Sequence, residues 1–294
     1  MLHDETVLRK ELAASAAAIR SHYDTGNDFF GKWLDPSLCY SAARWKSDTD
    51  SLAIAQRRKL DWHLDGAHVH PGSRVLDIGC GWGAFLLAAS HRGARQVVGL
   101  TPSHEQAAWI REQTGRSKVH VIETTWQNSN LENQFDAIIS IGALEHFARP
   151  ELGYYEKERA YTQFFDFCQR SLVPGGRVSL QFIGWMNVPR EDEYKHLPRV
   201  LFPESNLPRL EEVFSSAARK FHLIRLENRP SDYIRTLNAW LVQLRRNRLA
   251  LKASHGRETL RAYVNAFQRF VLGFQAGSIG LYRAVWVHRP ESLW

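Results

Sequence analysis

The sequence predicts a doubly wound α/β protein, in which helices cover both faces of a mostly parallel sheet. Short apolar segments rich in β-branched residues recur along the chain, as expected of strands that are buried on both faces. Helical segments of crossover length separate most of these strands. A glycine-rich turn follows the first predicted strand and leads directly into a helix, which is typical of this fold class.

Seven strands are expected, and the last two come after a long interruption. The turn Pro174-Gly175-Gly176 separates the fifth strand from the helical segment before it. The predicted strands span residues 74–78, 96–100, 119–122, 135–141, 177–183, 221–226 and 281–287.

Helices are expected before the first strand and between the last two. Apolar residues recur every three or four positions in residues 1–20 and 51–64, and a long helical region covers about 232–276. The segment after the fifth strand has four prolines among charged residues, which indicates a lid. We therefore expect four parts: an N-terminal helical cap (1–70), a core (71–184), a lid insertion (185–220), and the end of the core sheet with a covering helical insertion (221–294).

Composition excludes several classes of protein. No segment of the 294 residues approaches the ~18 uninterrupted apolar residues of a membrane-spanning helix. The N-terminus has acidic residues and no apolar core, so we expect no secretory signal and a cytoplasmic location. The three cysteines form no C-x-x-C pair, which argues against a disulfide scaffold or a metal site. A net charge of +7 with 10 tryptophans leaves nucleic acid, an anionic membrane and an acidic small molecule open as partners.

The glycine-rich turn is the most specific motif. Asp77 lies near the end of the first strand, and glycines follow at alternate positions from Gly79 to Gly83. Glycines let a ligand approach the backbone closely, and the following helix offers its N-terminal amides. A dinucleotide dehydrogenase would have an acidic residue about 20 positions later, but the second strand ends at Leu100-Thr101-Pro102. The Asp–Gly spacing instead resembles that of class I S-adenosylmethionine-dependent methyltransferases.

A narrower resemblance extends from about residue 20 to 186. The chain resembles cyclopropane fatty acid and mycolic acid cyclopropane synthases in six motifs: HYDxGNDFF (22–30), LDP (34–36), YS (40–41), DIGCGWG (77–83), GLTxSxEQ (99–106) and SIGAxEHF (140–147). The resemblance implies a Rossmann-like class I methyltransferase fold with a seven-stranded, mostly parallel sheet, an N-terminal cap over the cofactor and helical lids. It also implies S-adenosyl-L-methionine as methyl donor and S-adenosyl-L-homocysteine as product.

The same resemblance assigns the residues that bind the cofactor. Residues after the N-terminal helices close over its methionine end, those of the glycine turn and second strand surround its centre, and those after the third strand lie beside the adenine. The family usually has Leu where this chain has Pro102. The implied set is Tyr40, Ser41, Asp77, Gly79, Gly81, Thr101, Pro102, Gln106, Trp126, Gln127, Ile141 and Gly142.

The implied reaction centre departs from the family at two positions. Cyclopropane synthases hold a bicarbonate ion as base with Cys, Glu, His, Tyr and the backbone amide of an Ile. Glu145, Tyr233 and Ile141 match these positions, but Ala42 and Gln181 replace the cysteine and the histidine. Because such a site offers an anion fewer hydrogen bonds, we expect bicarbonate to bind weakly or not at all.

Three catalytic candidates and an aromatic substrate pocket follow. Glu145 is the candidate general base or cation stabiliser, with His146 and Tyr233 beside it. Aromatic faces stabilise cations, although each aromatic side chain also suits core packing. The predicted substrate pocket consists of Tyr23, Gln181, Phe182, Trp185 and Trp240.

Three functions stay open. The altered base site favours a C-methyltransferase, which adds a methyl group to an alkene of a lipid, prenyl or terpenoid natural product. A carbocation would form and then be deprotonated or cyclised. The first alternative is a cyclopropane synthase acting on unsaturated acyl chains. The second alternative is an N-methyltransferase of a small amine, which the adjacent Glu145 and His146 favour.

The expected partner is a small, hydrophobic, unsaturated molecule. No N/D-P-P-Y/F signature of base methylation is present, so we expect no nucleic acid. Basic residues at 57–59 and 245–248 suit a solvated helix face, or would attract a phosphorylated acceptor or an anionic membrane surface. Peripheral membrane contact and homo-oligomer formation stay open.

Overall fold

The core of the molecule is a seven-stranded sheet. The computed structural model describes residues 12–23, 25–115, 118–132, 134–195, 201–202 and 204–289. The strand order is β3-β2-β1-β4-β5-β7-β6, with β7 antiparallel to both of its neighbours and the other pairs parallel. This arrangement confirms the predicted fold class. The strands are β1 (Arg74–Ile78), β2 (Gln96–Thr101), β3 (Val119–Glu123), β4 (Phe135–Ile141), β5 (Leu172–Trp185), β6 (Phe221–Asn228) and β7 (Ile279–His288).

The predicted strands are all present, and the fifth is longer than predicted. β5 begins at Leu172, which pairs with Phe135 of β4, so the strand includes the residues predicted as the turn 174–176, and pairing with β7 carries it on to Trp185. Because this pairing is a contact between distant parts of the chain, the local sequence pattern could not reveal where the strand ends.

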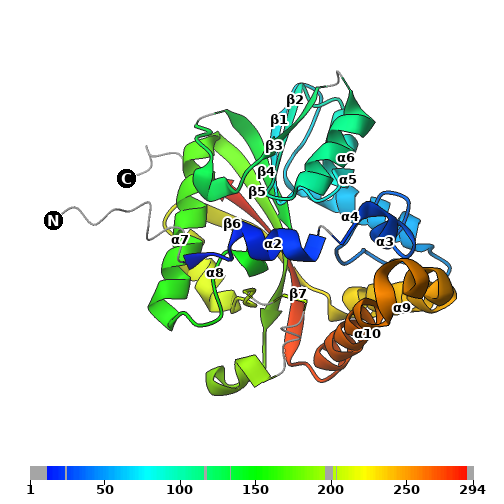
Figure 1. Ribbon diagram of the computed structural model, residues 1–294. Helices are drawn as coiled ribbons and strands as arrows, with labels where there is room; N and C mark the ends of the chain where they lie inside the picture. The colour runs from blue at the N-terminus through cyan, green and yellow to red at the C-terminus, as the bar shows by residue number, and fades with distance from the viewer. Residues whose placement is uncertain are drawn as a thin grey trace.

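Helices cover both faces of the sheet, as Figure 1 shows. One face carries α4 (Leu52–Gly66), α5 (Ala84–His91) and α6 (His104–Thr114), and the other carries α7 (Tyr154–Ser171) and α8 (Leu210–Ala217). Helix α8 packs on α7, and its Val213 and Ala217 are fully buried in the core. The predicted lid insertion is therefore wrong for this part, because an apolar helix face covers the sheet there. The segment also contains the short 3-10 helix η3 (Arg190–Lys195).

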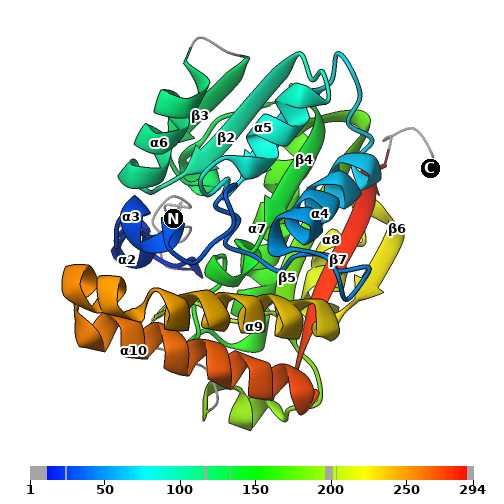
Figure 2. The same cartoon turned by 90° about the vertical axis from the view of Figure 1, so that its right-hand side faces the viewer.

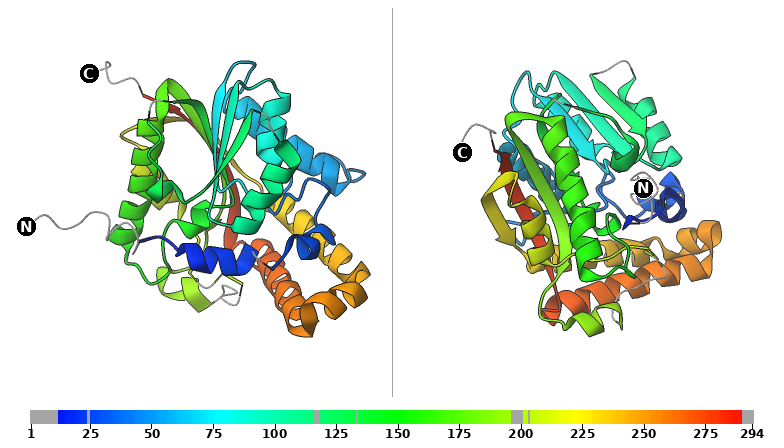
Figure 3. Two further views of the ribbon diagram at one scale, coloured as in Figure 1. Left: turned by 45° about the horizontal axis from the view of Figure 1, so that its top comes forward. Right: turned by 90° about the vertical axis from the view of Figure 1, so that its left-hand side faces the viewer.

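The remaining helices lie at the carboxyl ends of the parallel strands. These are α2 (Ala16–Tyr23), α3 (Asn27–Gly31), α9 (Pro230–Arg246) and α10 (Arg248–Gln275). Figure 2 shows α9 and α10 side by side, with α2 and α3 between this pair and α6. Figure 3 shows α2 passing along the edge of the sheet. Residues 1–11 of the predicted N-terminal helix lie outside the described residues.

Two further observations concern these helices. Gly256, with a φ of 83°, interrupts α10 within the predicted region 232–276. No helix in the described part of the chain is long and apolar enough to cross a membrane.

A buried guanidinium joins four separate segments of the chain. The side chain of Arg283 on β7 is 0% exposed. It pairs with Asp232 of α9 at 2.8 Å and donates to the backbone carbonyl of Ala43 at 2.9 Å and to Oε1 of Gln181 on β5 at 2.6 Å. Because a buried charge is stable only while its partners remain in place, β5, β7, α9 and the segment around Ala43 are held in one arrangement.

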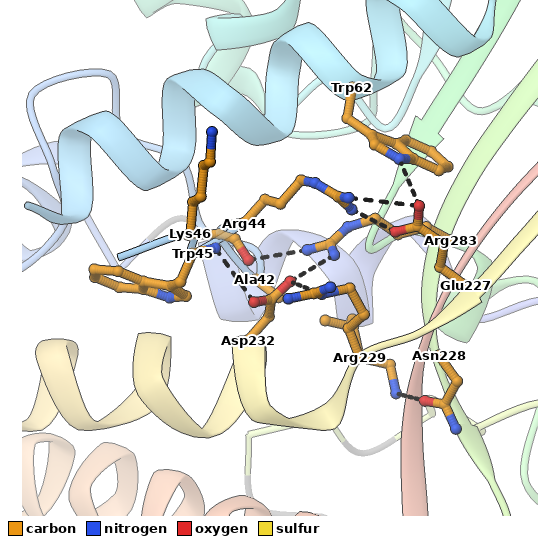
Figure 4. Close-up of polar contacts among 12 residues, drawn as sticks. Ala42, Arg44, Trp45, Lys46, Trp62, Glu227, Asn228, Arg229, Asp232 and Arg283 are labelled. Atoms are coloured by element: carbon orange, nitrogen blue, oxygen red, sulfur yellow. Dashed lines mark hydrogen bonds and ion pairs between the residues drawn. The ribbon is translucent and has the colours of Figure 1, made fainter. Parts of the chain in front are cut away.

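A second layer of polar contacts surrounds this guanidinium (Figure 4). The other carboxylate oxygen of Asp232 accepts from the backbone amide of Trp45 at 3.2 Å, and Arg229 donates to Asp232 from the surface at 3.1 Å. Glu227 of β6 accepts from Arg44 and from the indole of Trp62. The segment that follows α3 is thus bound to α9 and to the antiparallel edge of the sheet.

Replacing Arg283 with Met should destabilise the fold strongly. The change leaves the buried Asp232 without its main partner, and removing one member of a buried ion pair costs about 3–5 kcal/mol. The matched control is Arg229→Met, because Arg229 pairs with the same carboxylate but its side chain is 41% exposed. Exposed pairs contribute about 0–1 kcal/mol. Urea unfolding measures both free energies, and equal losses in the two variants would contradict this account.

Candidate active site

A cavity lies at the carboxyl ends of the parallel strands, beneath α2. Its volume is about 1000 Å³, and the glycine turn after β1 forms its floor. The structure brings all twelve residues of the predicted cofactor set to this one cavity: Tyr40, Ser41, Asp77, Gly79, Gly81, Thr101, Pro102, Gln106, Trp126, Gln127, Ile141 and Gly142. Ala14, Ile19 and Tyr23 also line it, so the described part of the N-terminal cap closes over this cavity.

The glycine turn has a conformation that other residues would not tolerate. Gly79 has a φ of 78°, and a Cβ atom there would come within 2.5 Å of the Cβ of Ala143. The amides of Gly79 and Cys80 both donate to the carbonyl of Leu100, at 2.9 and 3.0 Å, which attaches the turn to β2. Beside it, burial raises the pKa of Asp77 to about 7. The turn therefore presents bare backbone and a buried carboxyl group to a ligand.

The opposite end of the cavity has polar atoms without partners. The indole nitrogen of Trp126 and Oε1 of Gln127 are buried and have no hydrogen-bond partner among the described residues. Both belong to the short 3-10 helix η1 (Trp126–Asn128) that follows β3. The Trp126 ring also packs against Phe147 and Phe164. Since orphaned buried polar atoms are unfavourable, this end suits a ligand with its own donors and acceptors, as a nucleoside has.

A second cavity of about 800 Å³ adjoins the first. Five residues line both cavities, and they come from the cap, the segment after α3 and the end of β4: Tyr23, Tyr40, Ser41, Gly142 and His146. The rest of the second cavity is mainly apolar, with Ala42, Phe182, Ile183, Phe202, Leu207, Leu237, Phe267, Phe270 and Leu281. A ligand in the first cavity can therefore present one group across this border to an apolar molecule.

Glu145 provides a carboxylate in this apolar cavity. It lies on the short 3-10 helix η2 (Leu144–His146) and is 8% exposed. Its Oε1 accepts from the backbone amide of Ile183 at 2.7 Å, while Oε2 is buried and without a partner in the described part of the chain. Burial raises the pKa of Glu145 to about 7. The carboxyl group is thus able to take up or release a proton near neutral pH.

The other two catalytic candidates also reach the second cavity. Nδ1 of His146 lies 2.8 Å from Oγ of Ser205, and burial lowers the pKa of His146 to about 4, so its imidazole is neutral near pH 7. Burial raises the pKa of Tyr233 and of Tyr23, and the nearby Glu145 raises both further. Both phenols therefore stay protonated near neutral pH, where Glu145 is partly ionised.

The two departures from the family pattern lie side by side. Nε2 of Gln181 donates to the carbonyl of Ala42 at 3.2 Å, and Oε1 of Gln181 accepts from Arg283. The amide is therefore engaged at both ends, and Ala42 has no polar side-chain atom. Ile141 lines the first cavity with the rest of the cofactor set, and the backbone amide that donates to Glu145 is that of Ile183.

Two predicted pocket residues lie behind the cavity wall. Trp240 is fully buried and packs against Trp33 and Phe267, and it is Phe267 that lines the cavity. Trp185 is the last residue of β5, beyond the part of the strand that lines the cavity. It is 3% exposed within the same apolar cluster. These two assignments are corrected because α9 and α10 supply an inner layer. Tyr23, Gln181 and Phe182 do line the cavity, as predicted.

Comparison with known proteins agrees with this geometry. The sequence model of the family described as mycolic acid cyclopropane synthetase matches residues 10–284. Cyclopropane mycolic acid synthase 2 of Mycobacterium leprae is 34% identical over 290 residues, covering 90% of this chain and 91% of that protein. The chain belongs to the mycolic acid cyclopropane synthetase family. It is therefore a methyltransferase, as the sequence predicted.

Two further relatives of this family support the assignment. The cyclopropane-fatty-acyl-phospholipid synthase of Escherichia coli K12 is 34% identical over 221 residues, which are 75% of this chain and 54% of that enzyme. The crystal structure of the mycolic acid cyclopropane synthase CmaA1, complexed with SAH and CTAB, superimposes with a TM-score of 0.83 at 29% identity. It covers 94% of this chain and 99% of the other. The expected class I methyltransferase fold is confirmed.

The pH dependence of stability should report the burial of Glu145. Below about pH 4.5 the carboxyl group is protonated in both the folded and the unfolded chain, and between pH 4.5 and about 7 only the folded chain keeps the proton. The wild type therefore loses stability across this window, whereas a neutral side chain would not. Relative to the wild type, Glu145→Gln should gain roughly 2–3 kcal/mol of unfolding free energy between pH 4 and pH 8.

Urea unfolding of both proteins at several pH values measures this difference. Taking the difference between them removes the contribution of Asp77, whose pKa is also raised. If the difference in unfolding free energy between the two proteins stayed constant across this pH range, the raised pKa of Glu145 would be refuted.

Proposed function

We propose that this protein methylates a carbon–carbon double bond of an unsaturated, lipid-like acceptor and closes a cyclopropane ring. One observation carries the proposal: Glu145, a buried carboxyl group with one oxygen unpaired among the described residues, lines an apolar cavity that adjoins the first cavity. The names of the relatives favour ring formation over the methylated alkene that the sequence alone favoured. The apolar lining suits an acyl or prenyl chain.

The first cavity is the proposed site of S-adenosyl-L-methionine. The orphaned atoms of Trp126 and Gln127 suit its adenine, and the bare backbone of the glycine turn suits its centre. When bound, this cofactor supplies an electrophilic methyl group. In this proposal the residues shared by both cavities, among them Tyr40 and Ser41, would hold the methyl-donating end of the cofactor at the border with the acceptor.

The residues of the second cavity would then control the cation that forms on the acceptor. Aromatic faces of Tyr23, Phe182 and Phe267 stabilise positive charge, each by ~0.5–2 kcal/mol depending on desolvation. The apolar wall excludes water, which would otherwise capture the cation. Oε2 of Glu145 removes a proton from the newly added methyl group, and the electron pair of that C–H bond closes the three-membered ring.

A methylated alkene is the second candidate product, and the altered anion site favours it. Ala42 and the engaged Gln181 leave bicarbonate with few donors, so Glu145 would act alone. If Glu145 removes a proton from a neighbouring carbon of the acceptor instead, an alkene is retained. Terpenoid or prenyl acceptors belong to this second candidate. Methylation of a small amine would need neither the apolar lining nor a base that removes a carbon-bound proton.

Product analysis with labelled S-adenosylmethionine tests the proposal. Unsaturated phospholipid vesicles, prenyl diphosphates, indole terpenoids and small amines are assayed in parallel, and products are identified by mass spectrometry and NMR. A cyclopropane ring from an unsaturated chain is expected. A methylated alkene would establish the second candidate, and label found only in amines would reject both.

Glu145→Gln should lower the turnover rate by about 10²–10⁴-fold, because the variant cannot accept a proton. The wild-type rate should rise with pH and level off above about 7, where the carboxyl group is ionised. The matched control is Ser205→Ala, which removes only the hydroxyl partner of His146. Undiminished turnover in Glu145→Gln would exclude Glu145 as the base.

Bicarbonate should have little effect on turnover. Removing it from the buffer by degassing is expected to leave the wild-type rate unchanged, because Ala42 has no polar side-chain atom and the Gln181 amide is already bonded to the carbonyl of Ala42 and to Arg283. The double variant Ala42→Cys/Gln181→His, which restores the residue types that the family uses, should gain a dependence on added bicarbonate. A wild-type rate that falls on depletion would show that the anion binds despite these substitutions.

A further inference from the structure

Lys59 is a buried cation that the sequence pattern assigned to a solvent-exposed basic cluster. Arg57 is exposed, with 75% of its side chain accessible, and Arg58 pairs with Asp50 at the surface. Lys59 is 2% exposed and lines the first cavity. Three consecutive residues of a helix cannot share one face, since each is turned by about 100° from the last. Lys59 lies on the inner face of α4 with Gln56 and His63, which are 0% exposed.

The contacts of Lys59 within the protein leave its charge uncompensated. Its Nζ donates to Oγ of Ser41 at 3.0 Å and lies 3.6 Å from Sγ of Cys39. Neither group is anionic, because burial raises the pKa of the Cys39 thiol. The positive charge of Lys59 acts to lower the pKa of Asp77, but no ion pair joins the two side chains in the described part of the chain. A buried ammonium without an anionic partner is costly, so an anion in the cavity would be bound favourably.

We propose that Lys59 binds the α-carboxylate of the amino-acid part of the methyl donor. The inference rests on the proposed function, in which the first cavity holds S-adenosyl-L-methionine. That part of the cofactor carries a carboxylate and an ammonium group, and the cavity offers a matching pair in Lys59 and Asp77. Lys59 is then a binding residue, and its bond to Ser41 makes it a positioning residue for the border between the cavities.

The layout of the cavity favours this end for the amino-acid part. The orphaned polar atoms of Trp126 and Gln127 lie beyond β3 and suit the adenine. Ser41 is one of the residues that line both cavities, so the proposed function puts the methyl-donating end of the cofactor on its side of the border. Because the sulfur that carries the methyl group joins the nucleoside to the amino-acid part, the latter extends toward the residues beyond Ser41. Lys59 is the cation there, held 3.0 Å from the hydroxyl of Ser41.

Calorimetry with two ligands separates a role of Lys59 in binding the carboxylate from a purely structural role, because it measures the affinity for each ligand. The ligands are S-adenosyl-L-homocysteine and its decarboxylated analogue, which lacks only the α-carboxylate. Lys59→Met should weaken S-adenosyl-L-homocysteine binding roughly 10- to 100-fold, the range for a hydrogen bond to a charged group. It should leave binding of the decarboxylated analogue nearly unchanged. Arg57→Met is the matched control, because it removes the same charge from the exposed face of α4, and it should alter neither affinity.

A second variant keeps the test decisive if the Met variant unfolds. Lys59→Gln keeps a hydrogen-bond donor on the side chain but carries no charge, so it should show the same loss specific to the carboxylate ligand. Circular dichroism verifies folding in each case. Equal weakening of both ligands, or of neither, would overturn the inference while leaving the proposed function intact. A wild-type protein that binds neither ligand would overturn both.

Discussion

The structure depends on one buried guanidinium. Arg283 contacts Asp232, the carbonyl of Ala43 and Gln181, and these residues lie on α9, the segment after α3 and β5. Burying a charge is unfavourable unless every partner stays in place, so the network requires these segments to adopt one relative position. The same contacts set the wall of the second cavity, because Gln181 and Ala42 both line it. The wall of the second cavity therefore depends on charge compensation in the core.

Burial has opposite effects on the groups that line the two cavities. It raises the pKa of Glu145 and lowers that of His146, so one apolar environment favours the neutral form of both side chains near pH 7. The folded protein holds a carboxylate at a cost in stability when the pH rises above about 7. An apolar wall that excludes water is nevertheless what a cationic reaction intermediate needs. The fold is therefore most stable when Glu145 is neutral, whereas the proposed chemistry requires its ionised form.

Motifs with a local physical basis were predicted well. The strands follow from short β-branched segments, and the glycine turn follows from a backbone conformation that Gly79 permits. The twelve cofactor candidates converge on one cavity because parallel strands bring their carboxyl ends to the same edge of the sheet. The errors concern residues whose surroundings come from distant segments. Trp185 and Trp240 are core residues because both pack in the apolar cluster to which α9 and α10 contribute, and Lys59 is buried because the face of α4 that carries it packs inward.

The sequence by itself determined the fold class, the family and the edge of the sheet at which ligands meet, since these follow from periodicity and from motifs within short segments. Only the tertiary structure decided which groups line the second cavity. It showed that the amide of Ile183 donates to Glu145, and that Gln181 is engaged at both ends. The physical reason is that hydrogen bonding and desolvation depend on atoms brought together from remote parts of the chain. A residue's chemistry is set by those neighbours, which no local pattern records.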